Sequence, residues 1–470
     1  MEQTIGTEAR PLRVAIIGAG PAAFYAAEVL FKQSNLVCQI DMYNRFPSPF
    51  GLVREGVAPD HESIKTVTRV YDRTASNPNF RYFGNVTFGT DVTHDELKPY
   101  YDQIIYAVGA QSDRRMGIPG EDLKGSYPAT IFVGWYNSHP DYRDLEFDLS
   151  AERVAVIGNG NVAMDVARIL VTDPDELAKT DIADHSLEAL RHSKVREVVM
   201  LGRRGPVQAA FTNPELKEFG ELAGVDVVVD PAELELDEAS AEALSTDKNA
   251  TKNLETLRKY AANTTHNNPR RITMRFLVSP VEILGEDGNV SAIKIEKNKL
   301  VLQSDGTMKA QGTGQYETLD VGLVFRSVGY RGVVLPGVPF DEKSGTIPNV
   351  AGRVIVNATG ETIPGEYVVG WAKRGPSGII GTNKPDSAAT VKSMVEDLPE
   401  ITPIDDANRD RAKVAQFLSE KGLICISYED WLKINEVEVS RGAAQGRPRV
   451  KFARVPEMLE CVKEGSQVKA

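Results

Sequence analysis

Two stretches of the sequence have the pattern of a buried strand, a glycine turn and the start of a helix. They read VAIIGAGPAA at residues 14–23 and VAVIGNGNVA at residues 154–163. Each places two glycines where a side chain would block either the tight turn or the close approach of a pyrophosphate, and a small residue where the helix packs on the strand. The backbone N–H groups that open each helix then face an anion. The pattern predicts an α/β fold with two dinucleotide sites.

A single match of this kind is weak evidence, because glycine turns follow strands in many α/β proteins that bind no nucleotide. Here both matches are followed by a long apolar helix face, at residues 24–30 and 164–170, which favours two real sites. The first turn is expected to bind its cofactor through Gly18, Gly20, Pro21, Ala22 and Ala23. The second turn is expected to use Gly158, Asn159, Gly160, Asn161 and Val162.

The residue that ends the second strand of such a unit meets the ribose and distinguishes the cofactors. In the first unit this residue is Asn44, which can bond a ribose hydroxyl and has no cation beside it for an extra phosphate. In the second unit the strand at 198–202 runs into Arg203 and Arg204. Their planar guanidinium groups suit a 2′-phosphate, although a solvated strand end is the alternative. The first unit is therefore predicted to bind FAD and the second NADPH.

Composition and charge narrow the class of protein. At 470 residues the chain can form two or more cores, and no apolar run approaches the ~20 residues of a membrane span. The first ten residues resemble neither a secretory signal nor an organelle transit peptide. The formal net charge of −12 argues against nucleic acid as a partner. We expect a cytoplasmic protein, monomeric or weakly oligomeric, with no membrane or nucleic-acid partner.

The three cysteines, Cys38, Cys425 and Cys461, are scattered singly along the chain. They cannot form a disulfide framework, a zinc site or an iron–sulfur cluster, and no metal is expected. An electron-input subunit of a larger complex, like the small subunit of glutamate synthase, is the alternative function, although those subunits carry cysteine clusters. A non-catalytic FAD module is a third hypothesis, which the intact glycines and paired arginines oppose.

Two similar apolar strands that end in glycine follow the two nucleotide units, one at 101–110 and one at 319–330. Strands of this kind return the chain between domains, so boundaries are expected near 111 and 331. The predicted organisation is a discontinuous FAD-binding domain interrupted by an inserted NADP-binding domain. The FAD-binding domain comprises residues 1–111 and 331–470, and the NADP-binding domain comprises residues 112–330.

Inside the second domain, residues 232–268 are acidic and then polar, and are interpreted as a solvated surface helix and loop. The segments 270–284 and 290–296 are predicted to be antiparallel strands. After the strand at 366–369, a helix that starts near Asp386 would direct its amides at a bound flavin.

Five longer blocks resemble the adrenodoxin reductase family, the NADPH-dependent ferredoxin reductases of mitochondrial type and their bacterial counterparts. The resemblance covers nearly the whole chain and implies noncovalent FAD, NADPH as hydride donor and a ferredoxin-type iron–sulfur protein as electron acceptor. A flavin is needed because a hydride carries two electrons and an iron–sulfur cluster accepts one at a time. The blocks are PSPFGLVREGVAPDH (47–61), GNGNVAMDVARIL (158–170), GRRGPVQAAFTNPEL (202–216), GWAKRGPSGIIGTNKPDS (370–387) and GRPRVKF (446–452).

The resemblance also implies roles for single residues. His61 and Glu215 match polar positions near the nicotinamide pocket, where they orient the ring or relay protons; a helix cap or surface residue is the alternative for His61. Asp165 is undecided between an inward polar contact and an exposed helix residue. The further positions that the resemblance implies for cofactor binding are Gly51, Leu52, Val108, Glu215, Trp371, Gly378 and Ile379.

Two residues depart from the family pattern. Asn44 stands where many members carry glutamate, so it can accept from one ribose hydroxyl rather than two, and Ala23 replaces a third glycine.

The surface that binds the electron acceptor is a separate question. An acidic ferredoxin needs a basic face for docking. Two clusters are candidates for that face: Arg270, Arg271 and Arg275, or Arg441, Arg447, Arg449 and Lys451.

Overall fold

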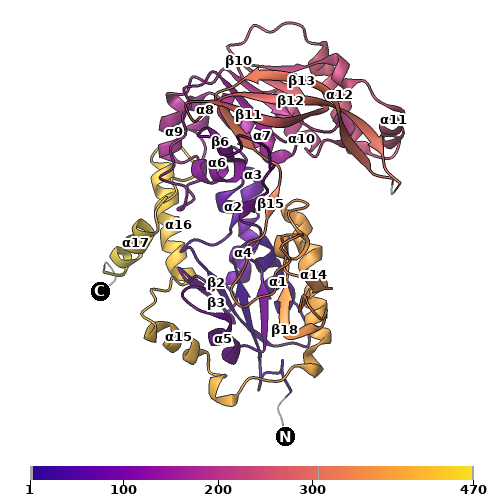
Figure 1. The fold of residues 1–470 in the computed structure, drawn as a ribbon. Coiled ribbons are helices and arrows are strands. Elements are labelled where there is room, and N and C mark those ends of the chain that lie inside the picture. The colour runs from indigo at the N-terminus through magenta and orange to yellow at the C-terminus, as the bar shows by residue number, and fades with distance from the viewer. Residues whose placement is uncertain (1–3, 305, 468–470) are drawn as a thin grey trace.

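The computed structural model describes residues 4–304 and 306–467. It contains two α/β units, a lower one with a seven-stranded sheet and an upper one with a six-stranded sheet (Figure 1). A three-stranded antiparallel sheet extends from the upper unit as an arm. The predicted fold class, with one Rossmann-like unit inserted into another, is confirmed.

In the lower sheet β1 is the middle one of five parallel strands, and all six residues of β1 are buried. Strands β3, β2, β1, β4 and β18 run parallel, and β17 and β16 add an antiparallel edge. In spatial order the strands are β16 (Asn349–Val350), β17 (Arg353–Ile355), β18 (Thr362–Val368), β4 (Gln103–Tyr106), β1 (Leu12–Ile17), β2 (Cys38–Asn44) and β3 (Phe80–Gly84). The helices of this unit are α1 (Pro21–Phe31), α2 (Leu52–Glu55), α3 (Glu62–Lys65), α4 (Thr68–Ala75), α5 (His94–Leu97), α13 (Trp371–Arg374), α14 (Asn383–Glu396), α15 (Arg411–Glu420), α16 (Tyr428–Ala443) and α17 (Val455–Gln467).

The upper sheet is parallel throughout. In spatial order its strands are β6 (Ser126–Pro128), β14 (Leu323–Arg326), β7 (Arg153–Ile157), β8 (Glu197–Leu201), β10 (Arg270–Arg275) and β9 (Val225–Val229). Its helices are α6 (Ala129–Tyr136), α7 (Asn161–Val171), α8 (Pro174–Leu177), α9 (Asp184–Arg191), α10 (Asn213–Phe219), α11 (Glu238–Leu244) and α12 (Lys248–Ala262). The arm consists of β11 (Val278–Glu286), β12 (Asn289–Leu302) and β13 (Met308–Asp320), paired antiparallel.

Two local predictions for the upper unit are wrong. The segment expected to be antiparallel from residue 270 begins with β10, which instead lies parallel between β8 and β9. A short alternating pattern fits either direction of pairing, so it could not decide between them. The segment 232–268 is not wholly solvated either, because α12 buries Leu254 and Leu257 in the core of the upper unit.

The chain enters and leaves the upper unit at adjacent points. Strand β5 (Ser112–Asp113) pairs antiparallel with β15 (Tyr330–Arg331), which brings the two crossings together. The lower sheet draws strands from both sides of this insertion. We propose domain boundaries near 111 and 331 on this basis.

The segment after α16 joins the lower unit to the upper one through hydrogen bonds and an ion pair. Arg447 donates hydrogen bonds to the carbonyls of Thr180 and Ile182, and Lys451 lies 3.1 Å from a carboxylate oxygen of Asp181. Arg447 and Lys451 are only 7% and 8% exposed. These two members of the predicted docking cluster are therefore buried between the units, whereas Arg441 is exposed and Arg449 pairs with Glu438 of α16.

Two of the three arginines in the other predicted docking cluster also have partners within the protein. Arg275 bonds the carboxylates of Glu233 and Glu317, and Arg270 donates to the carbonyl of Val171, so of the three only Arg271 is exposed. Sequence cannot show this pairing, because the acidic partners of Arg275 lie 42 residues away on either side.

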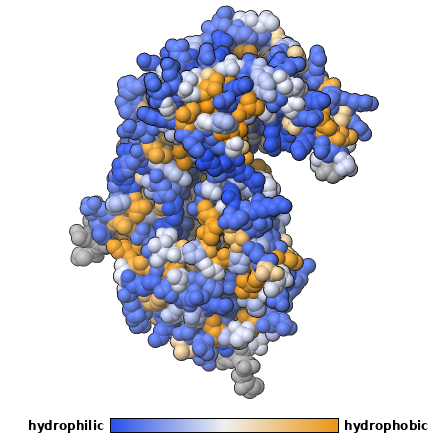
Figure 2. Space-filling view, in the orientation of Figure 1, coloured by the Kyte–Doolittle hydropathy of each residue, from blue (hydrophilic) through white to orange (hydrophobic). Residues whose placement is uncertain are grey.

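The outer surface is mixed in polarity and deeply indented between the arm and the lower unit (Figure 2). Within the described ranges, none of the helices combines the length and the apolarity that crossing a membrane requires.

Candidate functional site

The first glycine turn connects β1 to α1. Gly18 has a φ of +105°, and a Cβ there would lie 2.6 Å from the carbonyl oxygen of Ala107, so only glycine fits. At Gly20, in contrast, no atom lies within 4 Å of the position that a Cβ would take. The turn is closed against the protein on one side and open on the other. This is the shape that a bound pyrophosphate requires.

The other residues predicted at this turn surround it. Gly51 crosses above the turn, and a Cβ on it would lie 3.2 Å from the Cα of Gly20; Leu52 follows at the start of α2 with its side chain partly exposed. Val108 follows β4, and its backbone nitrogen lies 3.1 Å from the Cβ position of Gly18. Pro21, Ala22 and Ala23 form the first turn of α1, in which Ala22 and Ala23 are buried.

Asn44 ends β2 and has a fixed amide. Its Nδ2 donates to the carbonyls of Phe46 at 3.1 Å and Ser48 at 2.9 Å. With both donors used in this way, Oδ1 is the group that can accept from a hydroxyl. The arrangement fits the predicted bond from Asn44 to a ribose.

The loop after β18 lies close to the first glycine turn. A Cβ on Gly370 would lie 2.7 Å from the Cβ of Ala22. Trp371 donates from Nε1 to the carbonyl of Ser377 at 3.2 Å. The Ile379 side chain, next to Gly378, is 65% exposed. The loop that carries Trp371 and Ile379 therefore lies against the start of α1, beside the open turn.

The helix after this loop begins earlier than predicted. Helix α14 starts at Asn383, three residues before Asp386, because Pro385 is compatible with a first helical turn. Asp386 lies within that turn, where it accepts a hydrogen bond from the N–H of Gly370 at 2.7 Å and pairs with Lys373 at 3.1 Å. The helix start thus anchors the loop that carries Trp371.

The second glycine turn repeats the geometry of the first. Gly158 has a φ of +135°, and a Cβ there would lie 2.3 Å from the carbonyl oxygen of Ser327. At Gly160 the nearest atom to a Cβ would be 4.0 Å away. Asn159 has a buried Nδ2 with no hydrogen-bond partner among the described residues. An open glycine beside an unpaired donor fits an anionic ligand.

The start of α7 completes this second turn. Asn161 accepts a hydrogen bond from the N–H of Thr212 at 2.9 Å, and Val162 is half-buried against the core of the upper unit. Asn161 thereby ties the glycine turn to the segment that leads into α10.

Arg203 and Arg204 lie immediately after β8, beside the second glycine turn. In the part of the chain that the structure describes, neither guanidinium makes a hydrogen bond or an ion pair with a carboxylate. Burial and the positive charge of Arg203 lower the pKa of Arg204. Two adjacent, uncompensated cations form a site for a dianion such as a 2′-phosphate.

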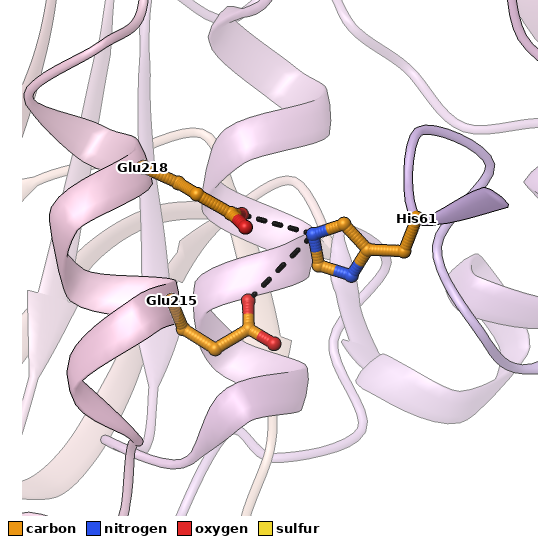
Figure 3. Close-up of side chains that lie close together, drawn as sticks. All are labelled: His61, Glu215 and Glu218. Atoms are coloured by element: carbon orange, nitrogen blue, oxygen red, sulfur yellow. Dashed lines mark hydrogen bonds and ion pairs between the residues drawn. The ribbon is translucent and has the colours of Figure 1, made fainter. Parts of the chain in front are cut away.

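A third group of side chains joins the two units. His61 precedes α3 of the lower unit, and Glu215 and Glu218 extend toward it from α10 of the upper unit (Figure 3). His61 Nε2 lies 2.9 Å from Glu218 and 3.8 Å from Glu215. The structure therefore brings the two predicted polar residues, His61 and Glu215, together across the interface.

Arg168 organises the carboxylates around His61. Its guanidinium contacts Asp60 at 2.7 Å, Asp165 at 2.7 Å, Glu218 at 3.4 Å and Glu215 at 3.5 Å. Asp165 is thus an inward-facing polar residue. Asp60, Arg168 and Glu218 were missed in the sequence. The signal for Arg168 and Glu218 was the helical spacing of three residues, Asp165 to Arg168 and Glu215 to Glu218, which places each pair on one helix face, whereas Asp60 lies outside a helix and had no such signal.

The cluster retains protons near neutral pH. Burial and the negative charge of Asp165 raise the pKa of Glu215 to about 7. Burial opposes the charged form of His61, but the hydrogen bond to Glu218 raises its pKa. A histidine and a carboxyl with raised pKa values, 3.8 Å apart, can hold and pass a proton.

His61, Glu215 and Glu218 also place three ligand atoms within 4.8 Å of one another, a spacing that could hold a metal ion. Arg168 already supplies a cation within 3.5 Å of both carboxylates.

Replacing Glu215 with glutamine is expected to flatten the pH dependence of stability. The raised pKa means that folding favours protonated Glu215, so its contribution is full below about pH 4.5 and is lost as pH rises through 7. Between pH 5 and 8 the free energy of unfolding of the wild type should fall by about 2 kcal/mol more than that of Glu215→Gln. Urea unfolding at the two pH values measures this difference. Glu188→Gln, on the exposed face of α9, is the control, and an equal pH slope in Glu215→Gln and wild type would contradict the assignment.

Comparison with known proteins agrees with this geometry. The model of the family described as pyridine nucleotide-disulphide oxidoreductase matches residues 12–379. The chain is 50% identical over 464 residues to a protein named NADPH-ferredoxin reductase FprA from Mycobacterium tuberculosis, covering 96% of this chain and 99% of that one. It is 40% identical over 464 residues to the mitochondrial NADPH:adrenodoxin oxidoreductase of Arabidopsis thaliana, covering 96% and 95% of the two chains.

The solved structure of M. tuberculosis FprA in complex with NADPH superposes with a TM-score of 0.91 at 48% identity, covering 97% of this chain and all of that one. The chain belongs to the pyridine nucleotide-disulphide oxidoreductase family and, within it, to the adrenodoxin reductase family that its sequence blocks resemble.

Proposed function

We propose that this protein is an FAD-dependent ferredoxin–NADP⁺ reductase, which takes a hydride from NADPH and delivers electrons singly to a ferredoxin-type iron–sulfur protein. The observation that carries the proposal is the pair of open glycine turns, of which the second lies beside Arg203 and Arg204 without an acidic partner. The near full-length similarity to proteins named NADPH-ferredoxin reductase supports the choice of donor and acceptor.

Bound FAD supplies the redox chemistry, because it accepts two electrons together and releases them one at a time. The residues of the chain bind and orient the reactants. The first turn and Asn44 hold the FAD pyrophosphate and ribose, and Trp371, Gly378 and Ile379 line the flavin. The second turn holds the NADPH pyrophosphate, and Arg203 and Arg204 bind its 2′-phosphate.

The interface cluster serves the proton that accompanies hydride chemistry. We assign to His61 and Glu215 the exchange of this proton at His61 Nε2 and the Glu215 carboxyl, which lie 3.8 Å apart. Arg168 orients the surrounding carboxylates through its contacts to Asp60 and Asp165, and although burial opposes it, the hydrogen bond from Arg168 lowers the pKa of Asp60. The contacts from Arg168 to Asp60 and from Glu218 to His61 also join the upper unit to the lower one.

We also propose a cytoplasmic location, supported by three free cysteines. The net charge of −12 supports the absence of a nucleic-acid partner. A monomer or weak oligomer, with no membrane partner, completes the proposal.

The purified protein is expected to be yellow and to bleach when NADPH is added without oxygen. NADH at the same concentration should bleach it at least about 100-fold more slowly, because two charge-assisted phosphate bonds are absent. Stopped-flow absorbance near the flavin maximum measures both rates, and addition of an oxidised ferredoxin should restore the colour. A protein that stays colourless after FAD supplementation, or that NADH reduces equally well, contradicts the proposal.

A further inference from the structure

We propose that Asn298, a residue of the arm outside both nucleotide motifs, is a positioning residue that sets the preference for NADPH over NADH. It does so by fixing the backbone of the turn that carries Arg203 and Arg204. The inference rests on the proposed function, since it takes these two arginines as the site of the 2′-phosphate.

Three consecutive carbonyls of this turn accept hydrogen bonds from the arm and from the residue that precedes it. The N–H of Val278 donates to the carbonyl of Gly202 at 3.0 Å, and the N–H of Leu277 donates to that of Arg204 at 3.1 Å. Between them, Nδ2 of Asn298 donates to the carbonyl of Arg203 at 2.9 Å. Of these three hydrogen bonds, the one from Asn298 is donated by a side chain, and the other two are donated by backbone N–H groups.

The arm is shaped to bring Asn298 inward. The pairing of β12 with β13 shifts register between Glu296 and Asn298, and a shift of this kind re-aims a side chain. Asn298 is 9% exposed, and its own N–H is held by the carbonyl of Leu277 at 2.7 Å. Its Nδ2 makes a second bond, at 2.8 Å, to Oγ of Ser279. The amide is therefore fixed in orientation before any ligand binds.

The turn needs this support because it holds two like charges side by side. Repulsion between Arg203 and Arg204 favours any backbone change that separates the guanidinium groups. Leu277, the other anchor at this point, has a φ of +54°, a conformation that costs energy in a branched residue. Without Asn298 the turn can relax, and a phosphate must then reassemble the pair at the expense of affinity.

The test compares Asn298→Leu with wild type in the FAD-loaded protein. Leucine keeps the four side-chain heavy atoms and the branch at Cγ of asparagine but has no donor for the Arg203 carbonyl. Loss of one such bond is expected to weaken binding of 2′,5′-ADP, measured by isothermal titration calorimetry, by about three- to tenfold. Binding of 5′-AMP, which lacks the 2′-phosphate, should stay within about twofold. In steady state with ferricyanide, KM for NADPH should rise and kcat should not change.

Ser279→Ala is the matched control. It removes the other acceptor of Asn298 Nδ2 from the same place in the arm but leaves the bond to Arg203 intact. This variant should bind 2′,5′-ADP like wild type. If Asn298→Leu does not fold, Asn298→Ser replaces it, because serine tolerates the polar surroundings and is too short to reach the Arg203 carbonyl.

The outcomes separate this inference from the proposed function. Unchanged 2′,5′-ADP affinity in a folded Asn298 variant, or an equal loss in Ser279→Ala, overturns the role of Asn298. Equal affinity of wild type for 2′,5′-ADP and 5′-AMP instead overturns the assignment of Arg203 and Arg204, and the NADPH preference with it.

Discussion

Replacing Arg203 and Arg204 together with alanine is expected to raise KM for NADPH about 10³-fold, because each guanidinium contributes about 1.5–3 kcal/mol through charge-assisted bonds to the 2′-phosphate. KM for NADH should change by less than about threefold, since that coenzyme has only a hydroxyl at this position. Neither arginine pairs with a carboxylate among the described residues, so the double variant should fold as well as wild type. Steady-state kinetics with both coenzymes and ferricyanide give the two values.

Arg271→Ala is the control for this experiment. Arg271 is exposed and lies at the start of β10, whereas the arginine pair follows the end of β8. It should leave KM for both coenzymes unchanged. A double variant that keeps its preference for NADPH would show that another part of the protein binds the 2′-phosphate.

Replacing Gly20 with valine should produce a folded but colourless protein. Gly20 has a φ of −86°, which any residue adopts, and no atom of the protein lies within 4 Å of the new Cβ. Valine then occupies the space of the pyrophosphate, and FAD content is expected to fall below about a tenth of the wild-type value. Absorbance after desalting reports bound FAD, and far-UV circular dichroism reports the fold.

Two other glycines provide the comparison. Gly18→Val introduces a backbone clash at 2.6 Å together with a φ of +105°, so it should cost more than about 3 kcal/mol and yield little folded protein. Gly160→Val, the equivalent of Gly20→Val in the upper unit, should stay yellow but no longer bleach with NADPH. Full FAD content in Gly20→Val would show that this turn does not hold the pyrophosphate.

The sequence predicted those parts of the fold whose physical cause is local. A buried strand, a glycine with positive φ and a helix start lie within ten residues of each other, so Gly18 and Gly158 could be recognised without knowing the rest of the chain. The arginines after β8 were recognisable for the same reason, because a strand end has a fixed place in such a unit.

Features that depend on distant partners could not be predicted in this way. Arg168 donates a hydrogen bond to Asp60, which lies 108 residues away in the sequence. Arg447 donates hydrogen bonds to carbonyls of a loop more than 260 residues away. Basic residues that neutralise buried carboxylates look the same in sequence as those on an open face. Arg275, Arg447 and Lys451 could not be distinguished from open docking residues for this reason, and β10 was misassigned because its parallel neighbours lie outside its own segment.

The insertion of one unit into the other determines the order in which a nascent chain can assemble. All strands of the upper sheet lie between residues 126 and 326, so this unit can fold as soon as it leaves the ribosome. The lower sheet must wait for β18 to join β4, after a gap of more than 250 residues, and Arg447 and Lys451 arrive later still. Release of a truncated product from translation would therefore leave the early strands of the lower sheet with an unpaired edge, a substrate for chaperones or proteases.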